Sequence, residues 1–165
     1  MINEFIIHHV WYSYLNIVNK NILVVGTGTI GEPLIGLLAE HKEALGIDNV
    51  TFFKRTPLTD ERGKVEALIR KGAKLATTSE AKKAFESMGF NVEDVENSYE
   101  ENQVIIDCTP SGNKNWEDIY SKLNGEKRFM AQGSEHEFGP FFAWGINNDS
   151  LNQDQNKYLI ASCNT

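Results

Sequence analysis

Apolar runs alternate with amphipathic segments along this chain from about residue 21 onward. The runs are short and bounded by glycine, proline or polar residues, which is typical of strands. The first run reads NILVVG and is apolar after its opening asparagine, so we expect a strand that is buried on both faces. The predicted strands lie at residues 21–26, 49–56, 73–78, 103–110, 127–133 and 157–163, with a further candidate at 141–147.

The intervals between these strands have helical spacing. After the first strand, apolar residues recur every three or four positions from Ile30 to Leu45. Pro33 stands near the start of this segment, where a missing N–H costs nothing. Ser79 and Gly89 are suitable caps for the two ends of a later helix. The predicted helices lie at residues 30–45, 60–72, 79–89 and 115–123.

This alternation favours an α/β fold with a mostly parallel sheet. We predict a Rossmann-like, doubly wound sheet that forms one domain over residues 21–165. Residues 1–20 contain several aromatic side chains and are predicted to be an N-terminal extension. A length of 165 residues and a hydrophobic content of 41% are sufficient for one domain with a substantial core.

The charge and the cysteines limit the possible partners. A net charge of −7 argues against nucleic acid, because phosphate backbones attract an excess of Lys and Arg. The first 20 residues lack the positive region of a secretory signal and are too polar to cross a membrane. Cys108 and Cys163 are therefore interpreted as free thiols of a reduced, cytoplasmic protein. We predict no membrane association and no metal site.

Three glycines follow the first predicted strand and open the first predicted helix. Gly26, Gly28 and Gly31 have the spacing G-x-G-x-x-G. In a dinucleotide-binding loop the first glycine permits a tight turn, the second lets a pyrophosphate approach, and the third allows helix–strand packing. The helix N-terminus then offers N–H groups to the phosphates, with Thr29 and Ile30 on the same loop. The alternative is a tight strand–helix turn that binds no ligand.

The second predicted strand ends in Lys54, Arg55 and Thr56. Proteins that bind NAD usually carry an acidic residue at this point, which holds the ribose 2′-OH. Asp48 instead precedes the strand, and two cations with a hydroxyl suit a 2′-phosphate. We therefore predict NADP as the cofactor, with NAD possible. The alternative is a solvated pair of surface cations.

Cys163 ends the last predicted strand, in the segment ASCNT. A catalytic cysteine needs a base within hydrogen-bond reach, and nothing in the sequence places any of the four histidines beside it. On the residues alone, this thiol is either a nucleophile or a free thiol near the end of the sequence.

Five segments, taken in order, resemble the archaeal-type phosphorylating glyceraldehyde-3-phosphate dehydrogenases. They read GTGTIG, KRTP, IDCTPSG, AQGSEHEF and ASCNT. The resemblance runs across residues 21–165, and the ordered set is more specific than any single motif. SCNT after a strand is the strongest piece.

The resemblance implies an enzyme that oxidises glyceraldehyde 3-phosphate to 1,3-bisphosphoglycerate through a cysteine thioester, with NADP or NAD as cofactor. On that pattern Cys163 is the nucleophile, and Ser162 and Asn164 contact the substrate. Inorganic phosphate would be the second substrate, and the full-length enzyme would be a homo-oligomer. From the glycine motif and the resemblance together, the predicted cofactor-binding residues are Gly26, Gly28, Thr29, Ile30, Gly31, Lys54, Arg55, Thr56, Thr109, Pro110, Gly112, Gln132 and Gly133.

A parallel sheet should bring several of these residues together. Ligands bind beyond the carboxyl ends of the strands in an open α/β sheet. Gly26, Lys54, Thr109, Gln132 and Cys163 each stand at such an end. We therefore expect five strand ends to converge on one crevice.

The family's catalytic domain, with its histidine base, would follow Thr165. We therefore expect the sequence to be a fragment that binds NADP weakly and does not turn over substrate. Two alternatives stay open. One is a related semialdehyde dehydrogenase or acyl-phosphate reductase, which shares the Rossmann half and the cysteine nucleophile. The other is a nucleotide-binding module without catalysis.

Overall fold

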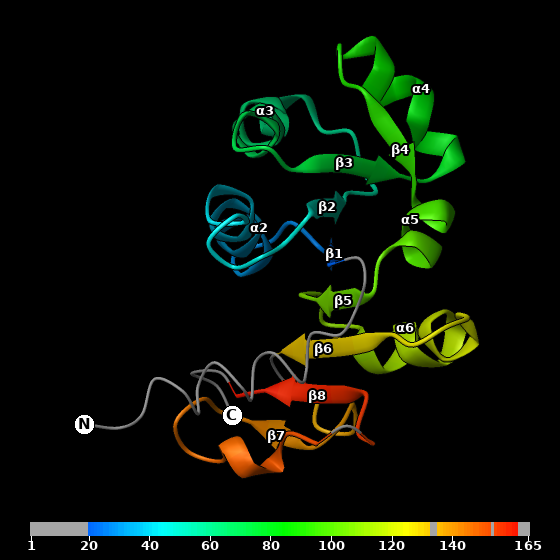
Figure 1. Ribbon diagram of the computed structural model, residues 1–165. Coiled ribbons are helices and arrows are strands. Elements are labelled where there is room, and N and C mark those ends of the chain that lie inside the picture. Colours follow the sequence, from blue (N-terminus) through cyan, green and yellow to red (C-terminus); the bar gives the residue numbers. More distant parts are fainter. Residues whose placement is uncertain (1–19, 133–134, 153, 162–165) are drawn as a thin grey trace.

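The computed structural model describes residues 20–132, 135–152 and 154–161 and contains the predicted parallel sheet (Figure 1). Its strands are β1 (Asn21–Val25), β2 (Asn49–Phe53), β3 (Lys74–Thr77), β4 (Val92–Asp94), β5 (Val104–Asp107), β6 (Arg128–Gln132), β7 (Phe141–Phe142) and β8 (Lys157–Ile160). Its helices are α2 (Gly31–Glu40), α3 (Arg62–Arg70), α4 (Ser79–Ser87), α5 (Val95–Glu101) and α6 (Gly112–Asp118). The short 3-10 turns are η1 (Thr59–Glu61), η2 (Tyr120–Lys122) and η3 (Asn148–Ser150).

The order of the strands across the sheet is β4-β3-β2-β1-β5-β6-β8-β7, and every pair is parallel. The chain builds outward from β1 on one side through β4. It then returns to the other side of β1 with β5. This reversal beside β1 defines the doubly wound arrangement, so the predicted fold class is confirmed.

The apolar run of β1 explains why the sheet is covered on both faces. Ile22 and Val24 belong to a core cluster that includes side chains of α2, α3 and α4. Leu23 and Val25 belong to a second cluster, which includes side chains of α5. Successive side chains of a strand point to opposite faces, so an uninterrupted apolar strand serves two cores. Figure 1 shows α2 and α3 on one side of the sheet and α5 and α6 on the other.

Two elements, β4 and α5, were not predicted from the sequence. Their segment reads VEDVENSYEE and has few apolar residues. The helix is defined instead by its N-terminal cap, because the Asp94 carboxylate accepts hydrogen bonds from the amides of Glu96 and Asn97, at 3.0 and 3.4 Å. Only Val95, Ser98 and Tyr99 of this helix are buried.

Two predicted elements are shorter than expected by five residues or more. Helix α2 ends at Glu40, and a series of turns that reaches Gly46 replaces the last predicted helical residues. Gly46 has a φ of +64°, which favours glycine and ends the helical path. The candidate strand at 141–147 contributes only the two residues of β7.

Candidate functional site

A cleft of about 340 Å³ opens beyond the carboxyl ends of β1, β2 and β5. This volume is at the lower end of the range of small-molecule sites, about 300–1,000 Å³. The cleft lies where the strand order reverses between β1 and β5, which is where doubly wound sheets bind ligands. Its lining residues are Val25, Gly26, Thr27, Phe53, Lys54, Arg55, Thr56, Leu58, Tyr99, Thr109, Ser111, Asn115 and Ile119.

The cleft brings together five of the predicted cofactor residues. These are Gly26, Lys54, Arg55, Thr56 and Thr109. The others that the structure describes lie outside the lining: Gly28, Thr29, Ile30 and Pro110 are exposed, Gly31 and Gly112 are buried, and Gln132 is half-buried. Four predicted residues lie outside the described part of the chain, namely Gly133, Ser162, Cys163 and Asn164. Three of the five expected strand ends therefore meet in this cleft.

The three glycines of the first loop differ in what surrounds them. A Cβ on Gly31 would lie 2.0 Å from the carbonyl oxygen of Gly26, so helix α2 can approach β1 only without a side chain there. Gly26 has a φ of +97°, and a Cβ on it would lie 2.9 Å from Thr109 Cγ2. A Cβ on Gly28, in contrast, would meet no atom of the described chain within 4 Å. Packing within the described chain therefore explains the first and third glycines but not the second.

The N-terminus of α2 adjoins this loop and has free hydrogen-bond donors. Ile30 precedes the helix and provides no side-chain cap. The amides of Thr29 and Ile30 donate no hydrogen bond to the described residues, and both residues are exposed. Unpaired N–H groups and the positive end of the helix dipole favour an anion at such a position.

The charged residues that line the cleft are basic, although the protein as a whole is acidic. Lys54 and Arg55 line it, and none of its lining residues in the described part of the chain is acidic. The full sequence carries 23 acidic and 16 basic residues, so this local excess of cations is not a reflection of composition. Lys54 is paired with Glu61, so the exposed Arg55 is the lining cation that favours an anionic ligand.

Asp107, at the end of β5, organises the far wall of the cleft. Its side chain is fully buried, and its Oδ1 accepts hydrogen bonds from the amide and the hydroxyl of Thr109, at 2.8 and 2.6 Å. Its Oδ2 accepts from Asn115 Nδ2 and from Tyr120 Oη, both at 2.7 Å. Four donors therefore satisfy one buried carboxylate. Burial raises the pKa of the Tyr120 phenol, and the negative charge of Asp107 raises it further.

Cys108 lies behind the glycine loop and is poorly suited to nucleophilic chemistry. Its Sγ accepts a hydrogen bond from Gln132 Nε2 at 2.8 Å. Burial raises the pKa of the Cys108 thiol to about 11, so very little thiolate is present at neutral pH. The contact also places Gln132 against Cys108 and outside the lining of the cleft.

Gly112 and Glu135 lie against each other at the start of α6. The Glu135 carboxylate is buried and accepts a hydrogen bond from the amide of Asn113 at 2.7 Å, near the start of α6. A Cβ on Gly112 would lie 3.2 Å from the Cβ of Ala131 and 3.3 Å from Glu135 Cγ. The AQGSEHEF motif thus supplies a residue that holds the N-terminal end of α6.

Sequence reasoning missed several residues of the site. Tyr99 was missed because helix α5 was not predicted. The sequence did contain two signals for this helix, namely Asp94 as an N-terminal cap and the four-residue spacing of Val95 and Tyr99. Asp107 belongs to the segment IDCTPSG, and the signal for it was a single acidic residue at the end of an apolar strand. Asn115 and Ile119 gave no signal, because their place depends on where α6 docks.

A doubly wound parallel sheet with a glycine loop at its reversal point defines a Rossmann-like fold. Solved structures agree on this fold. Glucose dehydrogenase from Haloferax mediterranei, in complex with NADP, Zn and gluconolactone, matches 95% of this chain and 40% of its own with a TM-score of 0.52 and 17% identity. A second structure of that enzyme matches 98% of this chain and 41% of its own with the same TM-score and 15% identity.

Sequence comparison adds particular relatives to this class. Glyceraldehyde-3-phosphate dehydrogenase of Sulfolobus acidocaldarius is 29% identical over 154 residues, which is 90% of this chain and 41% of the relative. The Methanobacterium formicicum enzyme of the same name is 29% identical over 151 residues, or 88% of this chain and 42% of the relative. The resemblance predicted from the five motifs is confirmed. The chain spans about two fifths of the length of these curated relatives, and no protein-family model matches it.

The described residues contain neither a membrane-spanning helix nor a metal-binding cluster. Within residues 20–132, 135–152 and 154–161, no helix has the length and apolar character needed to cross a bilayer. The same ranges contain no group of three or more His, Cys, Asp or Glu side chains arranged to hold a metal ion.

Proposed function

We propose that this chain is the cofactor-binding part of an NADP-dependent, phosphorylating glyceraldehyde-3-phosphate dehydrogenase. The open space at Gly28 is the observation that carries the nucleotide part of the proposal, because a ligand that approaches the backbone explains a glycine that packing does not. The two archaeal relatives support the choice of enzyme.

The residues present fit a dinucleotide. The exposed amides of Thr29 and Ile30 would hold the pyrophosphate at the N-terminus of α2. The aromatic ring of Tyr99 and the apolar side chain of Ile119 would contact the adenine, since both residues line the cleft. Arg55, whose guanidinium makes no ion pair with a described residue, would bind the 2′-phosphate.

The proposed chemistry centres on Cys163. Bound NADP⁺ supplies the acceptor for the hydride that leaves the substrate. The thiolate of Cys163 attacks the aldehyde carbon of glyceraldehyde 3-phosphate and, after the oxidation, is held as a thioester. Inorganic phosphate then attacks the thioester, which releases the acyl phosphate and regenerates the thiolate. Ser162 and Asn164 would contact the substrate, and the complete enzyme would be a cytoplasmic homo-oligomer.

Cofactor binding is tested by calorimetric titration and thermal unfolding of the 165-residue chain with NADP⁺ and NAD⁺. NADP⁺ at 100 times its dissociation constant should add about 2.7 kcal/mol to the free energy of unfolding and raise Tm by about 5–10 °C. AMP without the second nucleotide half is the control and should bind more weakly. No binding of either dinucleotide at millimolar concentration would refute the proposal.

The catalytic part is tested by alkylation of the two thiols at pH 7.5. Cys163 should react with iodoacetamide faster than a free thiol such as glutathione, whereas Cys108 should react more slowly because burial raises its pKa to about 11. Two pKa units above an ordinary thiol correspond to about 100-fold slower labelling of Cys108 until urea unfolds the protein. Mass spectrometry of tryptic peptides measures both rates, with Cys163→Ser as the control. A Cys163 of ordinary reactivity would instead favour a nucleotide-binding module without catalysis.

A further inference from the structure

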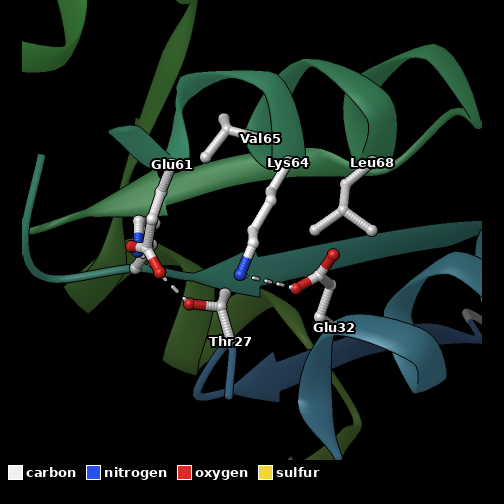
Figure 2. Close-up of a pocket in the computed structure, with 7 residues that line it drawn as sticks. Thr27, Glu32, Glu61, Lys64, Val65 and Leu68 are labelled. Carbon is white, nitrogen blue, oxygen red and sulfur yellow. Dashed lines mark hydrogen bonds and ion pairs between the residues drawn. The ribbon is translucent and has the colours of Figure 1, made fainter. Parts of the chain in front are cut away.

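Lys54 lines both the cleft and a second, much smaller pocket. The small pocket has a volume of about 10 Å³ and shares Thr27 and Lys54 with the cleft. Its lining residues are Thr27, Glu32, Lys54, Glu61, Lys64, Val65 and Leu68. Figure 2 shows that this pocket lies between the glycine loop, α2 and α3. Lys64 of α3 points toward Glu32 of α2, and its Nζ lies 3.5 Å from Glu32 Oε2.

The backbone of Lys54 is fixed at the carboxyl end of β2. Its amide donates to the carbonyl of Ala76 at 3.1 Å, and its carbonyl accepts from Thr77 Oγ1 at 2.7 Å. The flexible lysine side chain therefore starts from a fixed point, and Lys54 lines both pockets.

The ammonium of Lys54 is engaged in the small pocket. It forms an ion pair with the carboxylate of Glu61, the last residue of η1, and donates to Thr27 Oγ1 at 3.5 Å. Lys54 is only 8% exposed, and a cation buried to this extent needs a partner. The hydrogen bond from Lys54 lowers the pKa of Glu61, so the carboxylate is charged at neutral pH.

The two cations at the end of β2 are therefore not equivalent. Glu61 neutralises Lys54, whereas Arg55 is exposed and makes no ion pair within the described residues. A 2′-phosphate would compete with Glu61 for the ammonium of Lys54. A ribose 2′-hydroxyl carries no charge and would not compete.

We propose that Glu61 is a specificity-determining residue, which weakens the preference for NADP over NAD by withholding Lys54 from the 2′-phosphate. The proposal rests on the proposed function and adds a residue that acts through another residue. It predicts that Arg55 and Thr56 carry the recognition of the 2′-phosphate in this chain. It also predicts that removal of the Glu61 charge frees the ammonium of Lys54 to bind the 2′-phosphate.

The test is calorimetric titration of NADP⁺ and NAD⁺ into the wild-type chain and the Glu61→Gln variant. The variant should bind NADP⁺ about tenfold more tightly, because a charge-assisted contact to Lys54 becomes available. Its affinity for NAD⁺ should stay within about twofold of the wild-type value, since both cofactors share the pyrophosphate and adenine contacts. Adenosine 2′,5′-bisphosphate and AMP should repeat this pattern.

Three further variants separate the mechanism from a general charge effect. Glu66→Gln removes the same charge from α3, where Glu66 pairs with Arg62 at 2.8 Å outside both pockets, and should change neither affinity. Adding Lys54→Gln to Glu61→Gln should remove the gain. Arg55→Gln in the wild-type background should eliminate most of the preference for NADP⁺, and it tests the proposal without a change at the buried pair. Thermal unfolding of each variant verifies that it is folded.

Two outcomes would overturn the inference while leaving the proposed function intact. One is an equal change in NADP⁺ and NAD⁺ affinity on Glu61→Gln. The other is a gain that persists when Lys54 is replaced. Failure of the wild-type chain to bind either dinucleotide would instead reject the proposed function itself, and this inference with it.

Discussion

Gly28→Ala should weaken NADP⁺ binding about 10- to 100-fold and leave the protein folded. A Cβ at this position meets no described atom within 4 Å, and Gly28 is not among the glycines with positive φ, so the chain accommodates a methyl group. A bound pyrophosphate would have to approach the same backbone, and overlap with one methyl group costs about 1–3 kcal/mol. Calorimetric titration measures the affinity, and Tm should stay within about 2 °C of the wild-type value.

Gly31→Ala is the matched control, because the same methyl group should here lower the stability of the fold. Its Cβ would lie 2.0 Å from the carbonyl oxygen of Gly26, so the backbone of α2 must move. We expect a loss of about 3 kcal/mol or more in the free energy of unfolding. Wild-type affinity in a folded Gly28→Ala variant would show that the loop does not hold the pyrophosphate.

Asp107→Ala should destabilise the protein by about 3 kcal/mol or more. The substitution removes the acceptor for four hydrogen bonds. It leaves the part-buried donors of Thr109 and Asn115 and the buried hydroxyl of Tyr120 without that partner. Urea unfolding monitored by circular dichroism measures the change. Asp107→Asn should lose less, because its carbonyl oxygen retains part of the accepting capacity while its amide group opposes the remaining donors.

Asp118→Ala provides the surface control for that experiment. Asp118 is exposed at the end of α6, and its loss should change the free energy of unfolding by no more than about 0.5 kcal/mol. An Asp107→Ala variant as stable as Asp118→Ala would mean that the network around Asp107 contributes little to the fold.

The sequence was sufficient for features that depend on local chemistry. The continuous apolar character of β1 predicted a strand between two cores, and the spacing of Gly26, Gly28 and Gly31 predicted the strand–loop–helix unit. Both features follow from the backbone and from hydrophobic burial, which act over a few residues. The alternation of strands and helices likewise predicted the α/β class and the mostly parallel sheet.

Features that depend on tertiary contacts were not predictable in this way. KRTP shows two adjacent cations, but nothing in it indicates that Glu61 pairs with Lys54 and leaves Arg55 unpaired. Likewise, α5 is mostly polar, and its formation as a helix depends on the cap at Asp94 and on the few side chains that it buries. Such contacts are set by how helices dock on the sheet, and the sequence pattern alone does not specify docking.

The junction between β1 and β5 also determines how the cleft can form. It pairs residues far apart in sequence, such as Ile22 and Val104, and such non-local pairing is slow to form. One wall of the cleft comes from the β1–β2 half of the sheet, and the other comes from β5, α5 and α6. A nucleotide that touches both walls therefore fastens the two halves to each other. Amide hydrogens along this central ladder should then exchange most slowly when the ligand is bound.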